Sequence, residues 1–188
     1  EPDKATAALV ADTAHQLEQI PPARLFEEVC KLFLTGHAQQ TIAALQRFSL
    51  TRYLFPVLAP ASGSEDGPGL AALHPMVQRA MKSTDDRIAN GQSVTPAFLI
   101  AALLWGPVEV AAARLGKEGI SPFQAMERAG EEVLLAQLSR TAIPRRFSSV
   151  TRQIWLNQVR LTKTRGKRAL SILNQQRFRA SYDFLLLR

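Results

Sequence analysis

Apolar residues recur three or four positions apart along most of the chain, the spacing that gathers them on one side of a helix. Proline follows Thr95 and Ser121, two residue types that commonly precede a helix, and Gly36 stands where a helix would end. Alternation with a period of two is nowhere long enough to predict a strand. Helices are therefore predicted over about 3–19, 23–35, 38–48, 70–89, 95–105 and 121–139, with three more pieces from 144 to 188, broken near Gly166 and Asn174. The expected fold class is all-α, a multi-helix arrangement of roughly eight to ten helices.

The clearest loop is the segment APASGSEDGPG, residues 59–69, which is rich in glycine, serine and proline. We expect it to separate a neck-like helical region, 1–58, from a helical body, 70–139, and a basic C-terminal region, 140–188. No internal repeat typical of a helical solenoid is present in the sequence.

Composition excludes wholesale disorder, because 46% of the 188 residues are apolar and 21% are charged. The sequence has no uninterrupted apolar stretch of about 18 residues, so no membrane span is expected. The first residues lack the pattern of a signal peptide, and Cys30 is a single cysteine. These features favour a cytoplasmic location.

Charge is distributed unevenly along the chain. Residues 1–139 hold 11 basic and 15 acidic residues, a net charge of −4, whereas residues 140–188 hold 12 basic residues and only Asp183, a net charge of +11. Such polarity suggests a basic surface that meets a polyanion. A solvated basic tail and a surface that docks on an acidic neighbour stay open as alternatives.

Residue constellations for catalysis are absent from the sequence. His15, His37 and His74 lie far apart in the sequence and lack the spacing of metal ligands. No glycine-rich phosphate-binding loop of the Walker A type is present in the sequence. Cys30 has the apolar neighbours of a packed thiol rather than those of a nucleophile. The adjacent Asp85 and Asp86 point in different directions on a helix and cannot easily share one ion. We therefore expect neither a catalytic residue nor a metal site nor a bound cofactor in this chain.

A helix predicted from residue 145 onward has two opposite faces. Arg145, Arg152, Arg160 and Lys163 fall on one side of a helical wheel, whereas Phe147, Val150, Ile154 and Leu161 fall on the other. A helix of this kind packs on a core and turns a row of cations outward, as contacts with phosphates require. The predicted RNA-binding residues are Arg145, Arg146, Arg152, Arg160, Lys163, Arg165, Lys167 and Arg168.

Arg177 and Arg179 flank Phe178 a few residues ahead of Tyr182. Basic and aromatic residues interleaved in this way can bind single strands through phosphate pairing and base stacking. Because the two aromatic residues are four positions apart, a buried stripe on the last helix is the favoured interpretation for them. For the arginines, nucleic-acid binding is favoured.

Three stretches resemble the bacterial poly(A) polymerases, class II nucleotidyltransferases related to the tRNA CCA-adding enzymes. They are IPPARLFEEVCKLF at 20–33, TDDR at 84–87 with VTPAFLIAALLW at 94–105, and IPRRF at 143–147 through Trp155, GKRA at 166–169 and FRASYD at 178–183. The resemblance covers nearly the whole chain. It implies the RNA-binding neck, body and C-terminal part of an enzyme that adds AMP from ATP to RNA 3′ ends in mRNA polyadenylation and RNA decay.

The resemblance also implies what this chain lacks. In the family, the catalytic head with its Gly-Ser motif and magnesium-binding carboxylates comes before these regions, so the chain alone is expected to be inactive. Magnesium and ATP are expected for the full-length enzyme. Arg24, Glu28 and Lys31 are expected to support the nucleotide site from the neck helix. Two surface ion pairs, Arg24–Glu28 and Glu28–Lys31, are the alternative explanation of their spacing.

The implied partners are single-stranded RNA 3′ ends, the catalytic head of the same enzyme and proteins of RNA decay, with no membrane. The alternative function is a basic helical module that docks a protein partner of the RNA degradation machinery. Duplex-DNA binding is disfavoured, because no helix-turn-helix pattern is evident.

Overall fold

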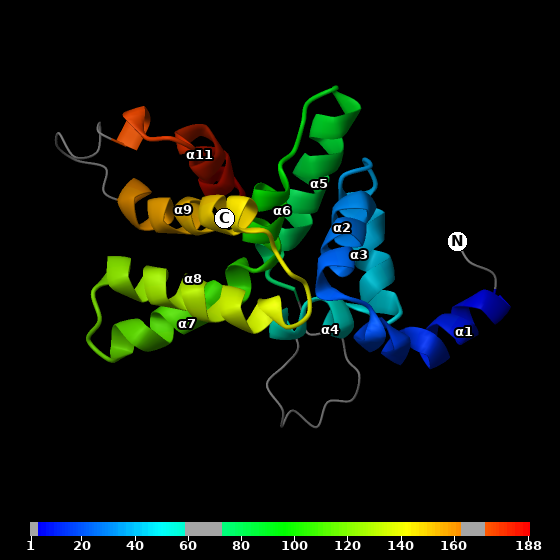
Figure 1. Cartoon of the computed structure of the whole chain (residues 1–188). Helices are drawn as coiled ribbons and strands as arrows, with labels where there is room; N and C mark the ends of the chain where they lie inside the picture. The colour runs from blue at the N-terminus through cyan, green and yellow to red at the C-terminus, as the bar shows by residue number, and fades with distance from the viewer. Residues whose placement is uncertain (1–3, 59–72, 163–171) are drawn as a thin grey trace.

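The computed structural model describes residues 4–58, 73–162 and 172–188, and these ranges are built from helices and turns (Figure 1). Within them lie ten α-helices and three short 3-10 helices, with no strand. The α-helices are α1 (Lys4–Thr13), α2 (Pro22–Phe33), α3 (Ala38–Arg47), α4 (Thr51–Leu54), α5 (Pro75–Ala89), α6 (Pro96–Leu103), α7 (Trp105–Lys117), α8 (Pro122–Leu138), α9 (Arg145–Leu161) and α11 (Phe178–Leu187). The predicted all-α class is confirmed.

Two predicted helices are interrupted in the structure. The first ends at Thr13 and continues as a 3-10 helix, η1 (Ala14–Gln19). The helix predicted through residue 105 ends at Leu103, and α7 leaves α6 at an angle of 57°. Pro107 lies in the first turn of α7 and has no N–H to donate to the carbonyl of Leu103, which explains why one continuous helix does not form.

A single apolar cluster extends from Leu25 in α2 to Phe184 in α11. Its largest fully buried side chains include Trp105, Trp155 and Phe33. Helix α6 is the centre of this core, because six of its eight residues are buried. Thr95 caps its first turn, where the hydroxyl accepts the backbone N–H of Phe98 at 3.4 Å.

Helices α7 and α8 pack as a pair, and α9 lies along α8 (Figure 1). Helix α9 also contacts α6 and α11, so three neighbours surround it on its buried sides. Helices α2 and α3 lie side by side, and α3 packs against α5. The remaining side of α9 faces solvent and carries its arginines.

Among the described residues, no single helix is both long and apolar enough to cross a membrane. Helices α6 and α7 meet that test only when taken together, across their 57° bend.

Candidate nucleic-acid interface

The buried face of α9 is held in place by hydrogen bonds as well as by apolar packing. Thr151 Oγ1 donates to the carbonyl of Ala97 at 3.0 Å, and Trp155 Nε1 donates to that of Ala101 at 3.1 Å. Both carbonyls belong to α6, so these bonds attach α9 to the central helix of the core. Because both side chains are fully buried, the rotation of α9 about its own axis is fixed.

Contacts with α11 fix the second half of α9. Asn157 Nδ2 donates to Ser181 Oγ at 3.0 Å, and Gln158 Nε2 donates to the carbonyl of Ser181, also at 3.0 Å. The amides of Asn157 and Gln158 are buried, which makes bonds of this kind costly to break. A rigid α9 in turn fixes which of its side chains point outward.

The four predicted RNA-binding arginines of α9 are all exposed. Arg145, Arg146 and Arg152 make no ion pair within the described ranges of the chain, and neither does Arg160. Their charges are therefore not neutralised by a described carboxylate. A row of exposed guanidinium groups on a rigid helix is suited to phosphate oxygens.

Two of these guanidinium groups are also oriented by neighbours. Arg160 Nη1 donates to Gln175 Oε1 at 2.8 Å, and the group lies 5.1 Å from the ring centroid of Phe123. Arg146 lies 4.8 Å from the centroid of the Phe147 ring. Contacts with a neutral amide or a ring leave the positive charge in place.

The other predicted RNA-binding residues, Lys163, Arg165, Lys167 and Arg168, lie outside the described residues. Their role stays a prediction.

Two of the three neck residues, Arg24 and Glu28, line an apolar groove of about 350 Å³ beside α2, whose other lining side chains are leucine, isoleucine and valine. Lys31 Nζ lies 2.9 Å from Glu28 Oε1, so one of the two predicted ion pairs forms. Helix α2 is joined to the start of α9, because the Phe26 and Phe147 rings lie 5.7 Å apart. The neck helix and the arginine-bearing helix therefore belong to one packed unit.

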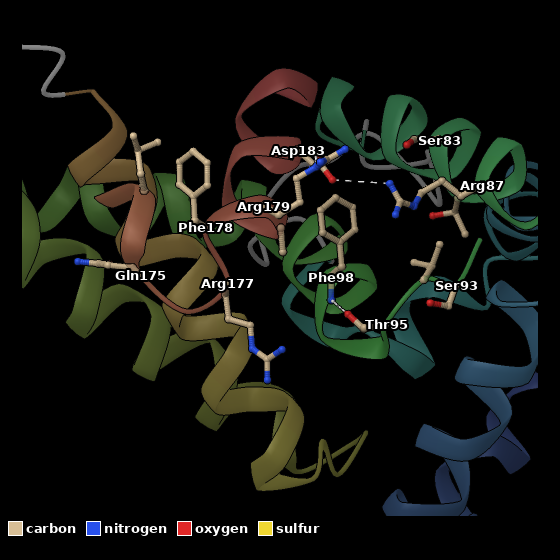
Figure 2. Close-up of a pocket in the computed structure, with 14 residues that line it drawn as sticks. Ser83, Arg87, Ser93, Thr95, Phe98, Gln175, Arg177, Phe178, Arg179 and Asp183 are labelled. Carbon is tan, nitrogen blue, oxygen red and sulfur yellow. Dashed lines mark hydrogen bonds and ion pairs between the residues drawn. The ribbon is translucent and has the colours of Figure 1, made fainter. Parts of the chain in front are cut away.

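A cleft of about 620 Å³ was not predicted from the sequence (Figure 2). It brings together the end of α5, the turn before α6 and the segment from Leu173 to Asp183. Its charged side chains are Arg87, Arg177, Arg179 and Asp183, and Phe98 and Phe178 add aromatic surface. No sequence motif connects these segments, since about eighty positions separate them.

Arg87 follows Asp85 and Asp86 in the sequence but pairs with a more distant acid. Its guanidinium lies 3.6 Å from Asp183 of α11. The Asp85 carboxylate instead accepts the backbone N–H groups of Ala38 and Gln39 at the start of α3, at 2.6 and 3.0 Å. Asp86 pairs with Lys82 at 2.7 Å.

The favoured interpretation of Phe178 and Tyr182 as a buried stripe is wrong. The two rings stack on each other with centroids 5.8 Å apart, and Tyr182 is 42% exposed. The buried positions of α11 are Ser181 and Phe184, which are displaced around the helix from the aromatic pair. The two rings are therefore placed at the surface next to the cleft.

The described residues hold no group of three or more His, Cys, Asp or Glu side chains placed to bind a metal ion. Burial, and next the negative charge of Glu27, raises the pKa of the Cys30 thiol. A raised pKa means less thiolate at neutral pH, which agrees with a packed thiol rather than a nucleophile.

Two family models match separate parts of the chain. The model described as "Polymerase A arginine-rich C-terminus" matches residues 118–188, which contain α8, α9 and α11. The model described as "Probable RNA and SrmB- binding site of polymerase A" matches residues 1–62, which contain α1 to α4.

Curated relatives match almost the entire chain. Poly(A) polymerase I of Escherichia coli O157:H7 is 38% identical over 184 residues, which is 97% of this chain and 39% of the relative. Poly(A) polymerase I of Salmonella typhimurium is 37% identical over the same shares. That of Haemophilus influenzae is 35% identical over 187 residues, 99% of this chain and 41% of the relative. The chain spans about two fifths of the length of the curated relatives it matches.

The all-helical fold and these matches define the class: the chain corresponds to part of a poly(A) polymerase, and residues 1–62 match the region described as its probable RNA-binding site. Over the matched regions the chain belongs to the poly(A) polymerase family.

Proposed function

We propose that this region holds single-stranded RNA through its phosphates while a catalytic head of the same enzyme adds AMP from ATP to the RNA 3′ end. Magnesium and ATP belong to the full-length enzyme, and the chain alone is expected not to extend a primer. The cytoplasm is the proposed location.

The arginine face of α9, formed by Arg145, Arg146, Arg152 and Arg160, is the observation that carries this proposal. Its guanidinium groups are exposed and lack described carboxylate partners, while buried bonds to α6 and α11 hold the helix still. Guanidinium groups bind phosphate oxygens strongly but do not read bases. Sequence preference is therefore expected to be low. Lys163, Arg165, Lys167 and Arg168 are proposed to extend the same track.

The neck residues are proposed to act differently. Arg24 and Glu28 line the groove beside α2, and Lys31 pairs with Glu28. We propose that this triplet supports the nucleotide site from below when the head is in place.

Docking of a protein through the arginine face is not favoured. The family description that names SrmB, together with RNA, applies to residues 1–62, which do not include α9. A protein partner from RNA decay is therefore proposed for α1 to α4 rather than for the arginine face.

The test is the affinity of the chain for short fluorescent oligo(A) across a salt series. The logarithm of the association constant is expected to fall with the logarithm of salt concentration, with a slope of about −0.7 for each phosphate neutralised. Four arginines would give a slope of about −3. A slope near zero would contradict the phosphate track, and tighter binding to duplex DNA would contradict the RNA assignment.

A further inference from the structure

The cleft between α5, α6 and α11 has a chemical character that the arginine face alone does not explain. It combines the positive charges of Arg87, Arg177 and Arg179 with one negative charge, that of Asp183. Hydroxyl groups of Ser93 and Thr95 line its other side. Its volume of about 620 Å³ is within the range of ligand-binding pockets.

Two of the cleft arginines are held by the single acid. Asp183 lies 3.6 Å from Arg87 Nη1 and 3.2 Å from Arg179 Nε, and its side chain is 26% exposed. One carboxylate shared by two guanidinium groups orients them without cancelling both charges. Arg177 makes no ion pair within the described ranges, so its charge adds to the excess.

Arg177 has an unfavourable backbone conformation, with φ of 68° and ψ of 14°. This left-handed region suits glycine or asparagine better than arginine. The carbonyl of Arg177 accepts both the N–H and the hydroxyl of Ser181 at 3.0 Å, and Asn157 of α9 binds that same hydroxyl. Strained residues held by their surroundings concentrate at functional sites.

An aromatic surface lies between the basic groups. Figure 2 shows the Phe98 ring between Arg87 and Arg177, with the backbone N–H of Phe98 bound to Thr95, the N-cap of α6. Phe98 is half-buried and meets Phe184 edge to face, with centroids 6.0 Å apart. Its ring is thus supported from the core while part of it remains open to the cleft.

The cleft is continuous with the arginine face of α9. Gln175 lines the cleft, and its Oε1 accepts a hydrogen bond from Arg160 at 2.8 Å. A single-stranded RNA that follows the arginines of α9 would therefore reach the cleft next.

We propose that this cleft receives one unstacked nucleotide of a bound single-stranded RNA, with a phosphate at Arg177 and the base against Phe98. The proposal rests on the proposed function. It makes the cleft a subsite that adds base stacking to a phosphate contact, whereas the arginine face binds by charge alone. The same chemistry would suit a free mononucleotide, and the test below separates the two sources.

The test measures oligo(A) affinity across a salt series for three variants. Arg177→Gly removes one phosphate contact, so the salt slope is expected to become shallower by about 0.7. Phe98→Leu keeps apolar volume but removes the ring, so affinity is expected to fall at least about 5-fold with the slope unchanged. Lys117→Ala, at an exposed position at the end of α7, is the control and is expected to change neither quantity. Thermal melting confirms that each variant is folded, and Arg177→Gly is expected to melt no lower than the wild type.

The outcomes distinguish this proposal from the one on which it rests. Steep binding by the wild type with no effect of Arg177→Gly or Phe98→Leu would overturn the cleft assignment and leave the arginine face intact. Failure of the wild type to bind oligo(A) would overturn both. AMP that displaces oligo(A) at equal nucleotide concentration would show a free mononucleotide to be the ligand and overturn the RNA assignment, whereas displacement by oligo(A) alone supports it.

Discussion

Arginines on α7 and on α9 occupy opposite electrostatic surroundings, although both helices pack against α8. Arg114 of α7 lies 3.1 Å from Glu118 and 2.8 Å from Glu132, so two carboxylates neutralise it. Arg145 and Arg152 of α9 are exposed without such a partner in the described parts of the chain. Arginines on the two helices thus differ in whether carboxylates of the same chain neutralise their charge.

The difference indicates where an external anion is expected. A paired arginine gains little from a phosphate, because binding must first separate it from its carboxylates. An unpaired arginine on a fixed helix has no such cost. The buried hydrogen bonds of α9 therefore serve binding indirectly, since they keep its cations oriented outward.

Removing the anchor of α9 is expected to have the largest effect. Trp155 is fully buried and bonded to Ala101, so Trp155→Ala should lower the free energy of unfolding by about 3–5 kcal/mol. Urea unfolding followed by circular dichroism measures this loss. A change below about 1 kcal/mol would show that Trp155 does not anchor the helix.

Close packing between α8 and α9 gives a smaller effect that a matched pair of variants can measure. A Cβ at Gly130 would lie 3.0 Å from Trp155 Cε3, whereas one at Gly116 of α7 would meet nothing within 4 Å. Gly130→Ala should therefore lower stability by about 1 kcal/mol, because overpacking exceeds the gain in helix propensity.

Gly116→Ala should instead raise stability by up to about 1 kcal/mol, since only the propensity changes. Thermal melting of the two variants side by side measures both signs. Equal shifts would contradict the close approach of α8 and α9.

The smallest expected effect is that of Arg114→Ala. Its ion pairs are half-exposed, so their loss should cost about 0.2–1 kcal/mol of stability. Oligo(A) affinity should not change. A clear loss of RNA affinity would place Arg114 in the interface and break the contrast with α9.

Much of α9 could be predicted from sequence, because an outward-facing basic stripe depends only on helical spacing. The polar residues on its buried face could not be predicted from sequence. Thr151, Asn157 and Gln158 are buried because carbonyls and hydroxyls of α6 and α11 lie opposite them, and tertiary packing alone supplies those partners.

The cleft was unpredictable for a similar reason. Arg87 and Asp183 are distant in the chain, and their 3.6 Å contact follows from the packing of α11 against α5. The spacing of Phe178 and Tyr182 predicted a buried stripe, but α11 turns Ser181 and Phe184 inward instead. A four-residue spacing shows that two rings share a face of the helix but not whether that face is the buried one.

The central claim is that unpaired arginines on α9 hold RNA, and one measurement tests it most directly. Oligo(A) affinity is measured across a salt series for two double variants, Arg145→Ala/Arg152→Ala on α9 and Arg114→Ala/Lys117→Ala on α7. Each double variant removes two positive charges. The α9 pair should make the salt slope shallower by about 1.4, whereas the α7 pair should leave it unchanged. Equal changes in the two double variants would mean that net charge, and not the arginine face of α9, determines binding.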